Sequence, residues 1–252
     1  MKKIKSINCY SFYKVIIVAV FSAIVLSCGK EDSPNPMPDP TPEPELGPSP
    51  AFYQSIDAGF NHSFGIAPND ELWGWGSNSV GQIGDSNQVF NRGPILIDSG
   101  YVSISAGGEV STSTHGGIFG VPITYTFYFC HTLGLRKDGT LWAWGNNVFG
   151  QLGVGNILTH KTPVQVGSGF VAIAAGNLHS LALKEDGTLW AWGRNQEGQL
   201  GDGTFVSQSV PILVGSDYIA IAADGGQSYA LKADGTLWAW GWNKYGQLGD
   251  NS

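Results

Sequence analysis

One motif, Asp-Gly-Thr-Leu-Trp-Ala-Trp-Gly, recurs along this chain with small changes and constrains the fold more than any other feature. Its second tryptophan falls at Trp75, Trp144, Trp192 and Trp240, which are separated by 69, 48 and 48 residues. A regular period of this length indicates a repeat architecture in which each repeat is one supersecondary unit. The tryptophans define four units: 57–104, 105–173, 174–221 and 222–252.

The content of each unit indicates short β-strands, because runs of β-branched and aromatic residues alternate with Gly, Asp and Asn. The turn glycines Gly139, Gly187 and Gly235 each follow an aspartate between two such runs. We predict two-residue hairpin turns at these places, since glycine adopts positive φ without steric cost. The first unit has Pro-Asn-Asp-Glu at 68–71, so a different turn is expected there.

A fourth strand per unit is indicated by apolar segments that begin at Pro94, Pro163 and Pro211. Proline removes a ladder donor and therefore suits an edge strand. Four short antiparallel strands per repeat, apolar on both faces, predict an all-β fold, a β-propeller of about four blades within residues 51–252. A solenoid is the alternative geometry.

Three motifs carry a family resemblance: His-Ser-Leu-Ala-Leu at 179–183, Asp-Gly-Thr-Leu-Trp-Ala-Trp-Gly at 186–193, and Asn-x-x-Gly-Gln-Leu-Gly at 195–201. They resemble the RCC1-like repeats of the regulator of chromosome condensation family from Ser55 to Asp250. The resemblance implies a propeller that usually has seven blades, so four blades suggest an incomplete ring and a piece of a longer protein. A four-bladed ring and an open arc closed by a second chain are the alternatives.

The start of the chain has the features of a secretory signal. Residues 1–28 combine a basic start, an apolar run too short to span a membrane, and a small residue before Cys28. This resembles a bacterial lipobox, which would make Cys28 the lipidated N-terminus; an ordinary signal with an incidental cysteine is the alternative. The sequence at 29–32 resembles a surface-export signal of some lipoproteins. We therefore expect a lipid-anchored protein of the bacterial cell envelope, on the outer membrane and exposed at the surface.

Residues 29–50 form a linker in this interpretation. Eight of the 13 prolines lie between Ser33 and Pro50, which predicts an extended spacer of roughly 50 Å; a proline-rich ligand segment is the alternative. Cleavage at Cys28 would leave 9 basic and 20 acidic residues, a net charge of −11. Because acidic surfaces repel phosphate backbones, nucleic acid is not an expected partner.

Two variable regions are candidates for a binding surface. The second unit contains an insertion, 108–129, in which alternation predicts an added hairpin that is either a binding loop or the seal of a blade edge. The loops after each Trp-Gly keep one asparagine while their other residues change character. The candidate surface consists of Phe127, Phe129, Phe149, Arg194, Trp242 and Tyr245. Unconstrained drift of the loops is the alternative.

The sequence contains no familiar catalytic or metal motif. His62, His131 and His179 share one repeat position with Gln227, which favours a structural hydrogen bond over a metal site. Cys130 lies in a strand-like run and is expected to be buried without a catalytic role.

We therefore predict a non-enzymatic propeller, without metal or cofactor, that binds an unidentified protein and is attached to the membrane by its lipid. The alternatives are an extracellular enzyme, for instance one directed at polysaccharides, and an inhibitor of a secreted enzyme. A convergent pair of carboxylates would favour the enzyme. Guanine-nucleotide exchange is disfavoured, because the signal sequence separates the chain from a cytosolic GTPase.

Overall fold

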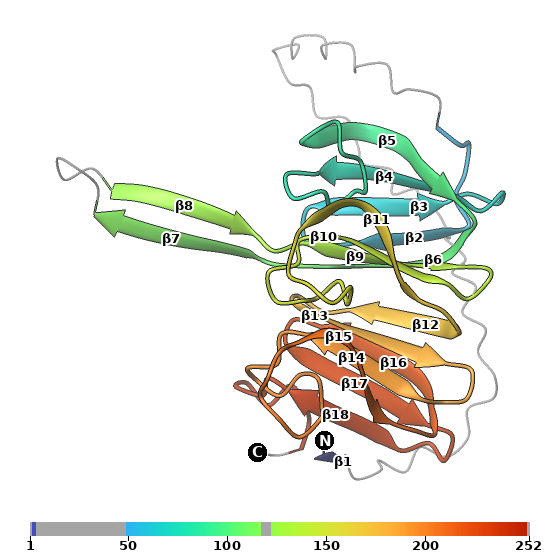
Figure 1. Cartoon of the computed structure of the whole chain (residues 1–252), viewed down its shortest axis with the longest axis vertical. Helices are drawn as coiled ribbons and strands as arrows, with labels where there is room; N and C mark the ends of the chain where they lie inside the picture. The colour runs from blue at the N-terminus through green and yellow to red at the C-terminus, as the bar shows by residue number, and fades with distance from the viewer. Residues whose placement is uncertain (1, 4–48, 117–121, 251–252) are drawn as a thin grey trace, which may run out of the picture.

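The computed structural model describes residues 2–3, 49–116 and 122–250, and all its regular elements are β-strands (Figure 1). Four antiparallel sheets of four strands each form the blades predicted from the repeats. Blade 1 consists of β2 (Ser55–Ala58), β3 (His62–Ile66), β4 (Glu71–Ser77) and β5 (Phe90–Ser99). Blade 2 consists of β6 (Tyr101–Gly107), β9 (His131–Arg136), β10 (Leu141–Gly145) and β11 (His160–Gly167).

Blade 3 consists of β12 (Phe170–Ala175), β13 (His179–Lys184), β14 (Leu189–Gly193) and β15 (Gln208–Gly215). Blade 4 consists of β16 (Tyr218–Asp224), β17 (Gln227–Lys232), β18 (Leu237–Gly241) and β1 (Lys2–Lys3). The first strands of successive blades, β2, β6, β12 and β16, contact one another in sequence order. They form the inner side of a stack of blades, and β5, β11 and β15 lie at the outer edges. Pro94, Pro163 and Pro211 lie inside these edge strands and not at their first residues, so the predicted strand starts are wrong by three to four residues.

The outer edge of blade 4 is paired with β1, whose Lys2 and Lys3 lie opposite Ala239 and Trp238. In the other three blades this position belongs to β5, β11 or β15. Cys28, the lipobox and linker residues 29–48 lie outside the part of the chain that the structure describes. Within the described part, no helix is long and apolar enough to cross a membrane.

The hairpin turns correct the sequence prediction. In blade 2 the Gly139 amide donates to the Arg136 carbonyl at 3.0 Å and the Arg136 amide donates to Thr140 at 2.9 Å, which leaves a three-residue loop. Gly139 has φ of 77°, and the intervening Asp138 is not among the residues with positive φ. A two-residue type I′ turn needs two positive φ values, whereas a three-residue loop with a bulge needs one. The glycine requirement is correct, but the predicted turn type is wrong.

Blade 1 makes the same turn, so the expectation of a different one is also wrong. The Asp70 amide donates to the Ala67 carbonyl at 3.0 Å, and the Ala67 amide donates to Glu71 at 2.9 Å. Asp70 has φ of 62° and occupies the place of the glycine. Aspartate adopts this left-handed conformation more readily than most residues, although less readily than glycine.

The repeated tryptophans pack and hydrogen-bond between each blade and the preceding one. Trp144 is fully buried against Phe64 and Tyr101, with ring centroids 6.0 and 6.1 Å away. Its Nε1 donates to the Gln82 carbonyl at 2.9 Å. The equivalent bonds in the next two junctions, also 2.9 Å, join Trp192 to Gln151 and Trp240 to Gln199. The spacing of the motif is therefore set by the junction between blades.

Both end faces of the stack expose apolar side chains that are covered in the interior. Ile56 of blade 1 is 76% exposed, whereas its counterpart Ile104 packs into the core between blades 1 and 2. Leu237 of blade 4 is 39% exposed, whereas Leu189 is fully buried. Trp75, the tryptophan of blade 1, is only partly buried and lies 5.9 Å from the ring of Tyr53. The stack is thus an open arc in which the end blades each lack one neighbour.

Candidate binding surface

The loops after each Trp-Gly are anchored by the recurring asparagine. The Oδ1 atoms of Asn78, Asn147 and Asn195 each accept a 2.9 Å bond from the amide five residues later, and all three side chains are buried. This explains why the asparagine recurs while its neighbours vary. The residue before this asparagine also takes part in the loop in blades 1 and 2, where Ser77 and Asn146 each accept a hydrogen bond from a glutamine side chain.

The insertion forms the expected hairpin, with β7 (Val110–Gly116) paired to β8 (Pro122–Tyr128) in a sheet of its own. It projects from blade 2 as an arm (Figure 1). The hairpin seals no blade edge, because neither strand pairs with another strand of the described chain. Its tip, 117–121, lies outside the described residues.

One face of the arm carries accessible apolar side chains from β8 beside Ser111, Ser113 and His115 from β7. Ile123, Tyr125 and Phe127 alternate along β8 as predicted and are 44%, 49% and 48% exposed. The opposite face carries threonines, including Thr114 and Thr124, whose hydroxyls are 3.0 Å apart. Half-exposed aromatic side chains on a projecting hairpin are available to a partner, because nothing in the described chain covers them.

The structure joins four of the six candidate residues into one continuous surface, which we call the aromatic strip: Phe127, Phe129, Phe149 and Arg194. The ring centroids of Phe127 and Phe129 are 6.3 Å apart, and those of Phe129 and Phe149 are 6.2 Å apart. The guanidinium carbon of Arg194 lies 5.6 Å from the Phe149 ring centre. The strip thus runs from the arm across blade 2 to the loop of blade 3.

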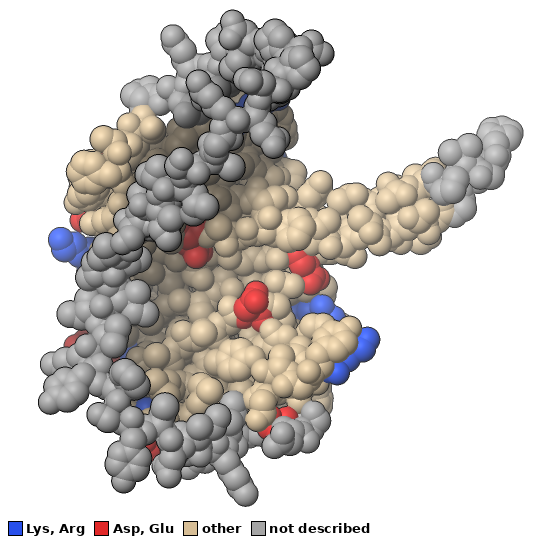
Figure 2. All heavy atoms as spheres, turned by 180° about the vertical axis from the view of Figure 1, so that it is seen from behind, with Lys and Arg blue, Asp and Glu red and all other residues tan. Residues whose placement is uncertain are grey.

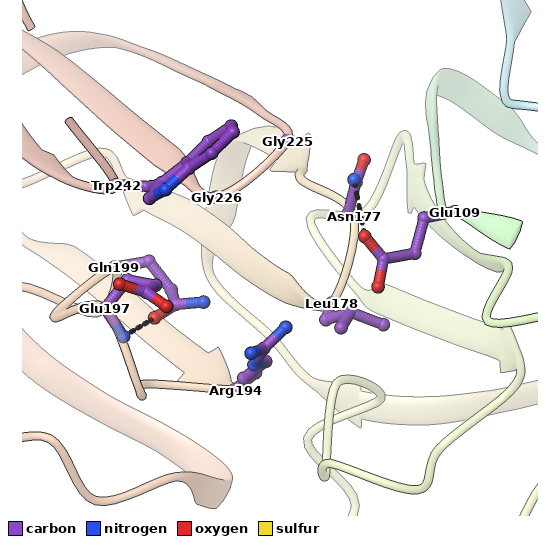
Figure 3. A pocket seen from close by; sticks show the side chains of 9 residues that line it. All are labelled: Glu109, Asn177, Leu178, Arg194, Glu197, Gln199, Gly225, Gly226 and Trp242. Atoms are coloured by element: carbon purple, nitrogen blue, oxygen red, sulfur yellow. Dashed lines mark hydrogen bonds between the residues drawn. The ribbon is translucent and has the colours of Figure 1, made fainter. Parts of the chain in front are cut away.

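The other two candidates form a second pair on blade 4. The rings of Trp242 and Tyr245 meet edge to face at 5.5 Å, and Tyr245 is well exposed. A pocket of about 300 Å³ connects this pair to the aromatic strip, because both Arg194 and Trp242 line it (Figure 3). All six candidate residues therefore surround one region at the base of the arm.

The pocket also contains residues that the sequence analysis did not single out, namely Glu109, Asn177, Glu197 and Gln199. Glu109 lies at the base of the arm and accepts a 3.0 Å hydrogen bond from Asn177 Nδ2. The two carboxylates, Glu109 and Glu197, stand on opposite sides of the pocket (Figure 3). The sequence feature that could have indicated the pocket is the Gly225-Gly226 pair. It stands directly before Gln227, where the other repeats have no glycine pair.

The surface around the pocket has an acidic character. Acidic side chains gather beside the base of the arm, with a few basic ones next to them (Figure 2). A second hollow near the inner ends of the blades is also lined by acidic residues, Glu109 and Asp224. Such a surface attracts cationic groups more than phosphates.

The histidines link neighbouring blades. Nε2 of His131 lies 3.0 Å from the Ser180 hydroxyl, which itself donates to the Gln151 carbonyl at 2.8 Å. Since that hydroxyl has one hydrogen, the histidine must donate through Nε2. The same arrangement joins His62 to Thr132 at 3.2 Å and His179 to Ser228 at 2.8 Å.

The surroundings of the histidines favour the neutral form. Burial lowers the pKa of His62 to about 4, of His131 to about 3 and of His179 to about 4. The described residues contain no group of three or more potential metal ligands. The hydrogen bonds from His62, His131 and His179 to the next blade agree with their interpretation as structural residues.

Cys130 is fully buried, and burial raises the pKa of its thiol to about 11. The thiolate is the reactive form of cysteine, so this side chain is inert near neutral pH.

Comparison with known proteins agrees with this architecture. Two family models, both described as the regulator of chromosome condensation (RCC1) repeat, match the chain. One covers 53–82, 170–199 and 220–247, and the other covers 138–183 and 186–231. These matches together span more than half of the chain. The fold and repeats define a β-propeller of repeated four-stranded blades. The chain belongs to the RCC1 repeat family.

Individual relatives support the same assignment. The chain is 30% identical over 119 residues to the Ultraviolet-B receptor UVR8 of Arabidopsis thaliana, a match that covers 46% of this chain and 22% of the receptor. It is 37% identical over 119 residues to the Protein RCC2 homolog of Danio rerio, covering 46% and 21%. This chain therefore matches about a fifth of the length of these curated relatives.

Solved propellers have the same fold. The structure of yeast RCC1 (Prp20) bound to Kap60 aligns with a TM-score of 0.61 and 25% identity, over 77% of this chain and 44% of the yeast protein. Human WBSCR16 aligns with a TM-score of 0.61 and 20% identity, over 74% and 46%. The four blades thus correspond to just under half of each solved propeller.

Proposed function

We propose that this protein is a lipid-anchored binding module of the bacterial cell envelope that captures a protein partner with the aromatic strip and the adjoining arm. The observation that supports it is the convergence of an exposed aromatic face with Arg194 at one end of the propeller. Aromatic and arginine side chains dominate binding energy at protein interfaces. Yeast RCC1 was solved with Kap60 bound, so a protein that contains such repeats can bind a protein partner.

The interface is testable by site-specific photo-crosslinking in intact cells. A benzophenone amino acid in place of Phe127 is expected to give a discrete crosslinked product. The matched control carries the same group in place of Glu185, an exposed residue in the turn at the opposite end of blade 3. Equal crosslinking at both positions, or none at Phe127, would contradict the proposed interface.

The lipid anchor is supported by the sequence of residues 1–28 and has its own test. Metabolic labelling with an alkyne fatty acid is expected to label the wild-type protein, and Cys28→Ser is expected to abolish the label. The serine variant should also leave the membrane fraction. Persistent labelling of the variant would rule out Cys28 as the attachment site.

An enzyme acting at the pocket is the second candidate, because Glu109 and Glu197 line the same pocket. Paired carboxylates serve as acid and base, or as acid and nucleophile, in glycoside hydrolysis. Against this role, Glu197 is exposed to solvent, whereas a catalytic acid is usually tuned by burial. Turnover of a polysaccharide by the wild-type protein and its loss in Glu109→Gln would favour the enzyme.

A further inference from the structure

An amide donor of Gln199 faces the pocket beside the aromatic strip and has no partner in the described chain. Gln199 as a residue is 2% exposed, and its Oε1 accepts a 2.9 Å hydrogen bond from the Glu197 amide. Its Nε2 points into the pocket (Figure 3), where no described side chain or carbonyl accepts from it, and this atom is not one of the fully buried unpaired atoms. The donor can therefore be reached from the pocket and is available to a ligand.

The same amide is satisfied in the preceding blades. Gln82 Nε2 donates to the Ser77 hydroxyl at 3.1 Å, and Gln151 Nε2 donates to Asn146 Oδ1 at 2.9 Å. In blade 3 the position of Ser77 and Asn146 is taken by Arg194, which has no acceptor atom. Its guanidinium donates instead to Gln196, at 2.7 and 3.0 Å. The Gln199 amide therefore lacks the hydrogen bond that its counterparts make in blades 1 and 2.

The room for a ligand comes from a second local change. Gly226 occupies the repeat position of Asn61, Cys130 and Leu178, and so lacks the side chain that the other blades place there. A Cβ at Gly226 would lie 3.2 Å from the Cβ of Trp242. With no side chain at this point, the Trp242 ring forms one wall of the pocket (Figure 3).

The chemistry of the walls favours a neutral ligand with many hydroxyls. Glu109 and Glu197 can only accept hydrogen bonds when ionised, whereas Arg194 and the Gln199 amide donate them. An anion would be opposed by the two carboxylates, which outnumber the single cation of the pocket, Arg194. A hydroxyl group both donates and accepts, so it can satisfy both kinds of wall. The electron-rich face of Trp242 would contact the positively polarised C–H groups of such a ligand.

We propose that this pocket binds a sugar ring non-covalently. Its volume of about 300 Å³ suits one ring or the end of a chain. The inference does not rest on the protein interface, which uses the aromatic rings of the arm and blade 2. It also does not require that the sugar be cleaved.

The test is saturation-transfer difference NMR on the full chain. The probes are glucose, galactose, mannose, N-acetylglucosamine and the β-1,4-linked disaccharides of glucose and N-acetylglucosamine. At least one probe is expected to receive saturation, most strongly at the C–H groups of one ring face, as stacking on Trp242 requires. The absence of transfer to every probe would overturn the proposal.

Two variants locate the binding. Gln199→Glu keeps the acceptor bonded to Glu197 but removes the amide donor, and Trp242→Ala removes the wall. Each is expected to weaken binding by about tenfold or more. Phe90→Ala changes an exposed ring on blade 1 that does not line the pocket and should bind as the wild type does. Thermal unfolding identifies any variant that fails to fold. If Gln199→Glu does not fold, Trp242→Ala still tests the site, because Trp242 is only partly buried.

Unchanged affinity in a folded Trp242→Ala variant would refute the assignment of the sugar to this pocket. Displacement of a bound sugar by the partner captured in cells would leave the sugar site in place and indicate that the two ligands compete. Release of reducing ends during the measurement would support both the sugar site and the enzyme candidate.

Discussion

Asp70 shows how one residue can occupy a place that the repeat normally gives to glycine. It has φ of 62°, close to the 77° of Gly139 in the same turn of the next blade. Left-handed backbone costs a non-glycine residue roughly 1 kcal/mol. Its carboxylate lies 4.0 Å from Lys137 Nζ, but this exposed pair contributes little. The conformation of Asp70 is therefore a net cost to stability.

Asp70→Gly is expected to raise the free energy of unfolding by about 0.5–1 kcal/mol. Urea unfolding at neutral pH measures the change. The matched substitution is Gly139→Ala, which has room for its Cβ but must adopt positive φ, and it should lose a similar amount. Destabilisation by Asp70→Gly would mean that the aspartate side chain contributes more than its backbone costs.

The repeat residues could be predicted from the sequence because their pattern is one-dimensional. The tryptophan spacing, the turn glycines and the structural histidines each recur in register, and the structure confirms their packing or hydrogen-bonding roles. The turn type could not be predicted, since it depends on where Arg136 and Thr140 pair, which the residue pattern leaves open by one position. The pocket could not be predicted either, because it depends on how the loops of neighbouring blades place Arg194, Gln199 and Trp242 beside one another.

At the scale of the element, the histidines make the junctions between blades sensitive to acid. Their folded-state pKa values, about 3 to 4, lie below the ordinary value of 6.5. The folded protein therefore binds fewer protons than the unfolded chain between these pH values, and stability falls as pH decreases from about 6.5 towards 4. Asp57 acts in the opposite direction, because burial raises the pKa of its carboxyl.

A triple variant is expected to lose less stability than the wild type between pH 7 and pH 4. It combines His62→Gln, His131→Gln and His179→Gln. Glutamine already occupies this position in blade 4, at Gln227, and its amide can donate to the neighbouring hydroxyl without titrating. Each pKa unit corresponds to about 1.4 kcal/mol, so the difference should reach several kcal/mol. Urea unfolding over this pH range measures it; parallel curves for the two proteins would contradict the assignment.

The arm is expected to be dispensable for folding. It forms its own two-stranded sheet, and its alternation was visible in the sequence because β8 places apolar side chains on one face and threonines on the other. Replacement of 111–127 by a short Gly-Ser turn should leave the thermal midpoint nearly unchanged, as is usual for changes away from the core. Differential scanning calorimetry measures the midpoint. A large decrease would show that the arm stabilises blade 2 and is not only a recognition element.

At the scale of the whole molecule, stability depends on junctions between blades, so equivalent residues differ with their place in the arc. Trp192→Phe removes the 2.9 Å bond to the Gln151 carbonyl at a fully buried site, and a loss of about 1–3 kcal/mol is expected. Trp75→Phe changes a partly exposed ring at the end face and should cost less. Urea unfolding of both variants provides the comparison; equal losses would indicate that another surface covers blade 1 in solution.

The end of the propeller beneath the arm is the proposed recognition surface. Hydrogen exchange, measured by mass spectrometry on the full chain alone and with the partner identified by crosslinking, tests it most directly. Partner binding at this surface is expected to slow hydrogen exchange in 123–129, 146–149 and 194–197. Protection confined to the turns at 137–140, 185–188 and 233–236, at the opposite end of the blades, would contradict it.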